Sequence, residues 1–460
     1  MRHWPAWALS IAATAAAADA PPPQEHPVLA EIAGAVSAAQ LQASVQALVG
    51  FGTRHTASDP KPAARGIGAA RRWAQQRFAA IAADCGGCLS VVTPAQTVTG
   101  ARLPVPTDIV DVVAVQRGSG QPERVVLITG HIDSRVSDVA NATADAPGAD
   151  DDASGVAAVL EAARVLSRYR FAATIVYGVL SGEEQGLYGG KLLAQYARDQ
   201  GWQVEADLNN DIVGASRGGN GVVDNTRVRL FSEATRPDET AAEARRRRFE
   251  GGELDGPSRN LARYAKRIAE AALPNWRVDL VYRVDRFGRG GDHEAFNELG
   301  MPALRFTEGA EDYRHQHQDL RRADGADYGD TIDHLDFDYL ARVTASNAVT
   351  LAALAWAPAP PAQLEIAGAV TPDTVLKWKA AGEGVAGYRV YWRDTAEPAW
   401  SHARWVGKVA EARLAGLAID DFSFGVAAVS ADGFESPVEF PGPVGAFTRV
   451  PPVPDAGASK

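Results

Sequence analysis

Apolar positions along the chain follow two spacings, one typical of strands and one typical of helices. Short, nearly continuous apolar runs predict buried strands at 109–115, 124–130, 173–180, 204–209 and 302–307. Apolar residues three and four positions apart predict helices at 29–49, 64–83, 154–168, 186–199, 257–272, 292–299 and 336–356. Since buried strands that alternate with helices form sheets covered on both faces, we expect an α/β fold with a mostly parallel or mixed central sheet. Residues 216–256 interrupt this rhythm with a polar, charged insertion.

The pattern changes after the last predicted helix. A Pro-rich run at 357–362 predicts a linker, and residues 363–450 contain short alternating strands separated by turns. This spacing is typical of an all-β sandwich, with Trp378 as a core residue. We therefore expect a larger α/β domain at 28–356 and a small C-terminal sandwich.

The N-terminus has the pattern of a signal peptide. Arg2 and His3 precede a short apolar stretch, and the small residues around Ala18 are what signal peptidase needs. We expect cleavage after Ala18, so that residues 1–18 are removed and the mature protein is secreted or periplasmic; the alternative is an uncleaved anchor. No later segment is apolar enough over a sufficient length to predict a transmembrane helix.

The chain has two cysteines, Cys85 and Cys88, in a Cys-Gly-Gly-Cys sequence. In a cytosolic protein this spacing would indicate redox chemistry or half of a zinc site. An exported protein meets an oxidising compartment, so we expect a short structural disulfide.

Charge excludes one class of partner. The formal net charge is −11, and phosphate binding needs a positive field, so we expect no nucleic acid partner. The composition, 46% hydrophobic and 22% charged, is that of a globular protein.

Candidate chemistry gathers at the ends of the predicted strands, the edge where open parallel sheets bind ligands. His131 follows the strand at 124–130, and Asp133 is placed to hold the far ring nitrogen of that imidazole. Asp150, Asp151 and Asp152 stand at the start of a predicted helix. One of them can cap the helix, but three adjacent carboxylates indicate a compensating cation.

Two further strands end in the same kind of residue. Glu183 and Glu184 follow the strand at 173–180; one can bind a metal ion while the other takes a proton from water. Asp211 ends the strand at 204–209, and His315 and His317 lie in a loop after the strand at 302–307. This inventory of nitrogen and oxygen donors suits zinc.

The order of these motifs over residues 40–352 resembles the co-catalytic di-zinc aminopeptidase family, whose relatives include glutamate carboxypeptidases and glutaminyl cyclases. The resemblance implies two zinc ions: His131 and Asp211 on one, Glu184 on the other and Asp151 bridging them. It implies Glu183 as the general base, with Asp133 behind His131.

The last ligand has two candidates. The family's histidine is followed by an acidic residue four positions on, a rule that His315 and Asp319 satisfy. The threonine usual after this histidine is absent, and His317 is the alternative. Asp292 and His293 resemble a family segment on the substrate side of the pocket.

Residues 363–450 resemble a fibronectin type III module, although Phe422 stands where a corner tyrosine is usual. Its binding partner is unknown.

The family resemblance implies hydrolysis of the N-terminal peptide bond of peptides with a free N-terminus. Two rivals stay open: a metallo-carboxypeptidase or dipeptidase with the same ions, for which Arg289 or Arg305 could bind the substrate carboxylate, and a catalytically inactive binding protein.

Overall fold

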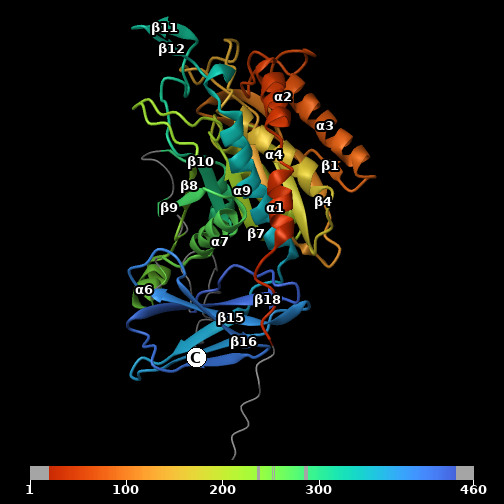
Figure 1. Cartoon of the computed structure of the whole chain (residues 1–460). Helices are drawn as coiled ribbons and strands as arrows, with labels where there is room; N and C mark the ends of the chain where they lie inside the picture. Colours follow the sequence, from red (N-terminus) through yellow and green to blue (C-terminus); the bar gives the residue numbers. More distant parts are fainter. Residues whose placement is uncertain (1–19, 236–238, 251, 253, 284–288, 442–460) are drawn as a thin grey trace, which may run out of the picture.

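An eight-stranded mixed sheet forms the centre of the molecule (Figure 1). The computed structural model describes residues 20–235, 239–250, 252, 254–283 and 289–441. From one edge to the other the strands are β1 (Ser90–Val92), β4 (Val112–Gln116), β6 (Ala173–Leu180), β5 (Gln121–His131), β7 (Gln203–Asn210), β10 (Ala303–Glu308), β8 (Arg227–Ser232) and β9 (Arg277–Val281). The central four, β6, β5, β7 and β10, are parallel, so their carboxyl ends lie at one edge. The predicted α/β class with a mixed sheet is confirmed.

Helices cover both faces of the sheet because the strand side chains alternate. In β5, Val126 and Ile128 join one core, while Val125 and Leu127 join the other. The first core is covered by α1 (Pro27–Gly34), α2 (Ala38–Val49), α3 (Ile67–Asp84), α4 (Ala153–Leu166), α7 (Pro257–Ala272) and α9 (Phe337–Trp356). The second is covered by α5 (Tyr188–Asp199) and α8 (His293–Glu298).

Two stretches differ from the sequence expectation. The helix expected at 29–49 is two helices, because Ser37 caps α2 by accepting from the Gln40 N–H. The region 216–256 contains a sheet strand, β8, and the helix α6 (Ala241–Glu250), so it is more than a surface insertion. Two hairpins flank the sheet: β2 (Ala95–Gly100) with β3 (Leu103–Val110), and β11 (Arg321–Ala323) with β12 (Ala326–Tyr328). A short 3₁₀ helix spans Ile332–His334.

Two small antiparallel sheets follow α9, drawn in blue in Figure 1. One contains β13 (Ala362–Ala367), β14 (Thr374–Lys379) and β17 (Glu411–Leu414); the other contains β16 (His402–Gly407), β15 (Val385–Asp394) and β18 (Phe422–Ser430). Trp378 lies in the core that the two sheets share.

The C-terminal sheets pack directly on the larger α/β part. Arg393, 1% exposed, donates to both oxygens of Asp255, which also pairs with Arg263 of α7. Phe434 enters the main core, where its ring lies 5.0 Å from that of Trp356. Buried charge pairs and a shared core make the two parts one packed unit.

Cys85 and Cys88 form a disulfide at the end of α3. Residues 1–18, the predicted signal peptide, lie outside the described residues. Among the helices of the described part, none is long and apolar enough by itself to cross a membrane; α1 and α2 meet the criterion only when taken together, and they are bent by 46°.

We predict that Phe434→Ala destabilises the whole chain by about 3 kcal/mol, because the lost ring leaves a cavity between the two parts. Thermal unfolding followed by circular dichroism should show a lowered midpoint. Val370→Ala, at a side chain that is 96% exposed, is the control and should leave the midpoint unchanged. An unchanged midpoint in Phe434→Ala would show that the parts do not depend on this contact.

Candidate metal centre

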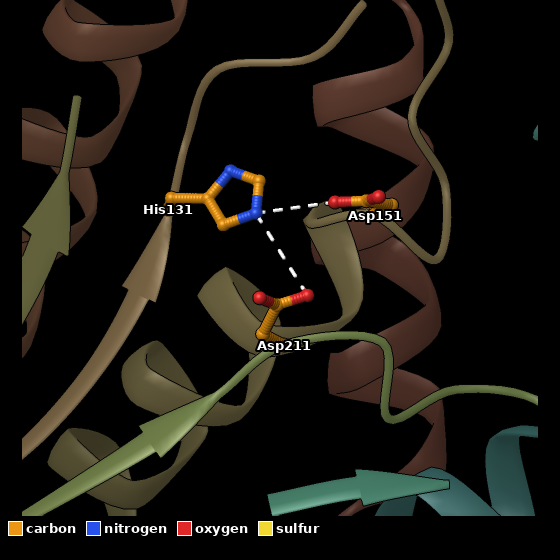
Figure 2. A group of neighbouring side chains, drawn as sticks. All are labelled: His131, Asp151 and Asp211. Atoms are coloured by element: carbon orange, nitrogen blue, oxygen red, sulfur yellow. Dashed lines mark ion pairs between the residues drawn. The ribbon is translucent and has the colours of Figure 1, made fainter. Parts of the chain in front are cut away.

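The carboxyl ends of β5 and β7 and the start of α4 bring the first group of donors together. Figure 2 shows His131 at the end of β5, with Asp151 and Asp211 both facing the same nitrogen of its ring. Nε2 of His131 lies 3.1 Å from Oδ1 of Asp151 and 4.0 Å from Oδ1 of Asp211. All three side chains are buried, and their donor atoms are close enough to share one ion.

A second group lies on the other side of Asp151. Nε2 of His317 is 2.9 Å from Oδ2 of Asp151 and 3.1 Å from Oε1 of Glu184. Asp151 thus contributes one carboxylate oxygen to each group. The structure brings together His131, Asp151, Glu184 and Asp211, as the sequence analysis expected.

Of the two candidate histidines, the structure places the alternative His317, and not the preferred His315, beside Asp151 and Glu184. The chain turns at His317, whose φ is 53°, and this turn points the two rings in different directions. His315 stacks on His334 and has Nδ1 3.0 Å from the carbonyl of Gly329. Asp319, which favoured His315 by its spacing, accepts hydrogen bonds from Ser137 instead.

The three adjacent aspartates have different partners and different roles. Asp152 caps α4 by accepting from the Gly155 N–H and also accepts from the His131 N–H. Asp150 accepts from the Gly214 N–H. Of the three, only Asp151 faces both groups of metal donors. The cation expected from the sequence would therefore be bound by one of the three aspartates and not by all of them.

Asp133 makes more hydrogen bonds to the loop that carries Glu183 and Glu184, which we call the glutamate loop, than to His131. Nδ1 of His131 lies 3.1 Å from the backbone oxygen of Asp133 and 3.7 Å from its carboxylate, so the carbonyl is the closer partner of the ring. The carboxylate accepts from the N–H groups of Gly182, Glu183 and Glu184, at 2.8, 3.3 and 3.1 Å. It therefore fixes the backbone that carries both glutamates.

Electrostatics in the centre favour positive charge. Burial opposes protonation of His317, but Glu184 and Asp151 outweigh it and raise its pKa to about 9. Burial likewise opposes protonation of His131, and Glu183, Asp133 and Asp151 hold its pKa well above its usual value. The carboxylates that attract these protons are equally suited to attract a cation.

Glu183 stands beside the donor groups without belonging to either. Its carboxylate is 3.9 Å from Nε2 of His131 and lines a cavity of about 550 Å³. Burial, helped by Glu184, raises the pKa of Glu183 well above its usual value. A carboxyl group with a raised pKa can both accept and return a proton near neutral pH.

Asp292 and His293 do not line this cavity. Both are completely buried: Asp292 accepts from the Gly190 N–H of α5, and Nε2 of His293 lies 3.9 Å from Glu233. In this structure the two side chains join α8 to its neighbours, and the expected substrate-side role stays a prediction.

Three arginines support the site, and the sequence analysis gave none of them that role. Arg135 donates to Glu184, and Arg305, 1% exposed, pairs with Asp211 at 3.0 Å, so Arg305 cannot bind a substrate carboxylate. Arg54, completely buried, donates to the carbonyls of Ile132 and Gly148 and so ties together the loops that carry His131 and Asp151.

Comparisons with known proteins give the family and the fold of the chain. Residues 111–343 match the family described as peptidase family M28. A probable zinc metalloprotease of Pyrenophora teres f. teres is 43% identical over 89% of this chain and 85% of its own length. A probable zinc metalloprotease of Leptosphaeria maculans is 44% identical over 89% of this chain and 95% of its own length. Among solved structures, the LapA aminopeptidase of Legionella pneumophila has a TM-score of 0.53 at 18% identity, over 73% of this chain and 76% of its own, a likeness of fold.

We predict that Asp133→Asn weakens zinc affinity about 10- to 100-fold, since an amide cannot accept from all the N–H groups that hold the glutamate loop. Titration of the apoprotein against a competing chelator measures the change. Asp108→Asn, at an exposed aspartate in β3, is the matched control. Equal affinity in both variants would mean that the loop keeps its position without this carboxylate.

Proposed function

The chain belongs to peptidase family M28 and is a zinc metalloprotease; on that premise we propose that it is an exported two-zinc aminopeptidase that hydrolyses the N-terminal peptide bond of peptides. The fold it shares with a solved aminopeptidase supports the proposal. The observation that carries it is the position of Asp151, whose two carboxylate oxygens face two different donor groups. A carboxylate in this position can bridge two cations.

The residues present fit zinc. Each donor group contains an imidazole nitrogen and two carboxylates, a ligand set that zinc accepts. Nε2 of His131 and Oε1 of Glu184 are buried and make no hydrogen bond to any described residue. Buried polar atoms without such partners are costly, and a bound cation would satisfy both.

His131, Asp151 and Asp211 would hold one zinc ion, and Asp151, Glu184 and His317 the other. When bound, the ions supply Lewis acidity that polarises a peptide carbonyl and makes a water molecule a better nucleophile at neutral pH. A ring that gives Nε2 to a cation keeps its proton on Nδ1. Nδ1 of His317, which lies 2.6 Å from Arg135, would then be a donor and could not accept from that guanidinium, so Glu184 would be its hydrogen-bond partner.

Glu183 is the proposed general base. It lies on the cavity wall beside both donor groups, where it can take a proton from water and pass it to the leaving amine. Asp133 holds the backbone of Glu183 in place. Arg305 and Arg135 orient Asp211 and Glu184 by charge-assisted hydrogen bonds.

Export is part of the proposal. The Cys85–Cys88 disulfide is consistent with an oxidising compartment, and residues 1–18 have the pattern of a signal peptide. We also propose that the C-terminal sandwich is a fibronectin type III module, supported by its two three-stranded sheets around Trp378.

We expect the zinc-loaded protein to hydrolyse alanine p-nitroanilide and to leave its N-acetylated form intact, because an aminopeptidase needs a free N-terminus. Cleavage of an N-blocked peptide with a free C-terminus would instead identify a carboxypeptidase.

Glu183→Gln should lower kcat about 10²- to 10⁴-fold without loss of zinc, since Glu183 belongs to neither donor group. Glu123→Gln, on the surface, is the control; full activity in Glu183→Gln would refute the assigned base.

We expect the two neighbouring histidines to behave differently. The wild-type chain should bind about two zinc ions, and His317→Ala about one, because only the Glu184 group loses its imidazole. His315→Ala is the matched control and should keep both ions. Elemental analysis after gel filtration measures the content. Loss of an ion in His315→Ala but not in His317→Ala would reverse the assignment.

A further inference from the structure

Nearly all the side chains that line the cavity over the metal centre are polar or charged. Among the described residues that line it, Leu187 alone has an apolar side chain. Pockets that select large apolar groups are lined mainly by hydrophobic and aromatic residues. This wall therefore does not favour a peptide chosen for a bulky apolar first residue.

Three arginines that line the cavity come from segments far apart in the sequence. We call Arg102, Arg135 and Arg289 the arginine rim. Arg102 lies in the turn between β2 and β3 and donates to the Glu184 carbonyl at 2.7 Å. Arg135 follows β5, and Arg289 precedes α8 and donates to Gln316 at 3.0 Å. Three separate loops thus bring a guanidinium to one opening.

Two members of the arginine rim have N–H donors that make no hydrogen bond to the described residues. A guanidinium has five N–H donors, and Arg102 and Arg289 each make one hydrogen bond to the described residues. Arg135 is more fully engaged, since it donates to Glu184 and Val136 and contacts His317. Arg102 and Arg289 are therefore the members able to bind an incoming group.

The charge of the opening favours an anion. The carboxylates of Asp151, Glu184 and Asp211 would be balanced by the cations they hold. The three arginines then outnumber the two other carboxylates of the lining, Glu183 and Glu294, so the charge around the entrance is positive. A guanidinium binds a carboxylate with two parallel hydrogen bonds, a geometry that few other groups match. The cavity, about 550 Å³, is of the size that takes a small ligand.

We propose that Arg102 and Arg289 bind a substrate carboxylate close to the scissile bond. Resting on the proposed function, this inference names the substrate class: short or acidic peptides. The carboxylate has two sources, the C-terminus of a dipeptide or the side chain of an acidic first residue. Both present the same planar anion to the rim.

Binding to zinc-loaded Glu183→Gln protein, measured by calorimetry, separates the cases without turnover. The probes are Ala-Ala, Ala-Ala-amide and Glu-Ala-amide, which place a carboxylate at the C-terminus, nowhere and on the first side chain. At least one acid should bind about tenfold more tightly than Ala-Ala-amide, and added salt should reduce the difference. The probe that binds more tightly than Ala-Ala-amide, whether Ala-Ala or Glu-Ala-amide, identifies the source of the carboxylate.

Variants assign the effect to the rim. Arg102→Gln and Arg289→Gln, made in the same background, should each reduce the acid-to-amide ratio of affinities, and Arg289→Lys should recover part of it. Arg322→Gln, on the distant β11–β12 hairpin, is the control. Equal affinity for all three probes, or a ratio unchanged in both rim variants, would overturn the inference. Because binding is the readout, absence of peptidase activity in the wild type would refute the proposed function and leave this test intact.

Discussion

The molecule depends on holding several buried carboxylates at one edge of a parallel sheet. Asp151, Glu184 and Asp211 approach one another because β5, β6 and β7 end side by side and because α4 begins opposite them. Anions buried this closely repel unless positive charge or hydrogen-bond donors compensate them. Arg135 and Arg305 supply part of that compensation, and the two imidazoles supply more. The negative charge that these groups leave uncompensated is the physical reason for a metal centre here.

Backbone N–H groups do the rest of the positioning. Asp133 gathers three of them from the glutamate loop, and Asp330 accepts from the N–H groups of Asp150 and Asp151. In both cases an acid that contributes no atom to a donor group fixes the backbone of one that does. The orientation of a ligand is thereby set by the fold and does not rely on its own side-chain rotamer.

The parts of the site that could be predicted from the sequence are those fixed by strand ends. His131, Glu184 and Asp211 directly follow apolar runs, and the carboxyl ends of parallel strands meet, so their proximity follows from periodicity. The choice between His315 and His317 could not be made that way, because it depends on the positive φ of His317 inside an irregular loop. The burial of Asp292 and His293 could not be predicted for a related reason: it comes from the packing of α8 on α5, and no local pattern encodes that packing. The strand β8 was missed because its polar flanks hide a short apolar core.

Chemistry and substrate choice are carried by different kinds of structure. The residues that would hold zinc lie at strand ends or, like Asp151 and His317, are held against them by several buried contacts, so the reaction is built into the rigid part of the fold. Arg102 and Arg289 lie in a hairpin turn and in a loop, where a substitution disturbs little of the core. A chain of this architecture can therefore change the peptides it accepts while keeping the same centre. For that reason, the likeness of fold to an aminopeptidase says less about the substrate than the charge of these two side chains.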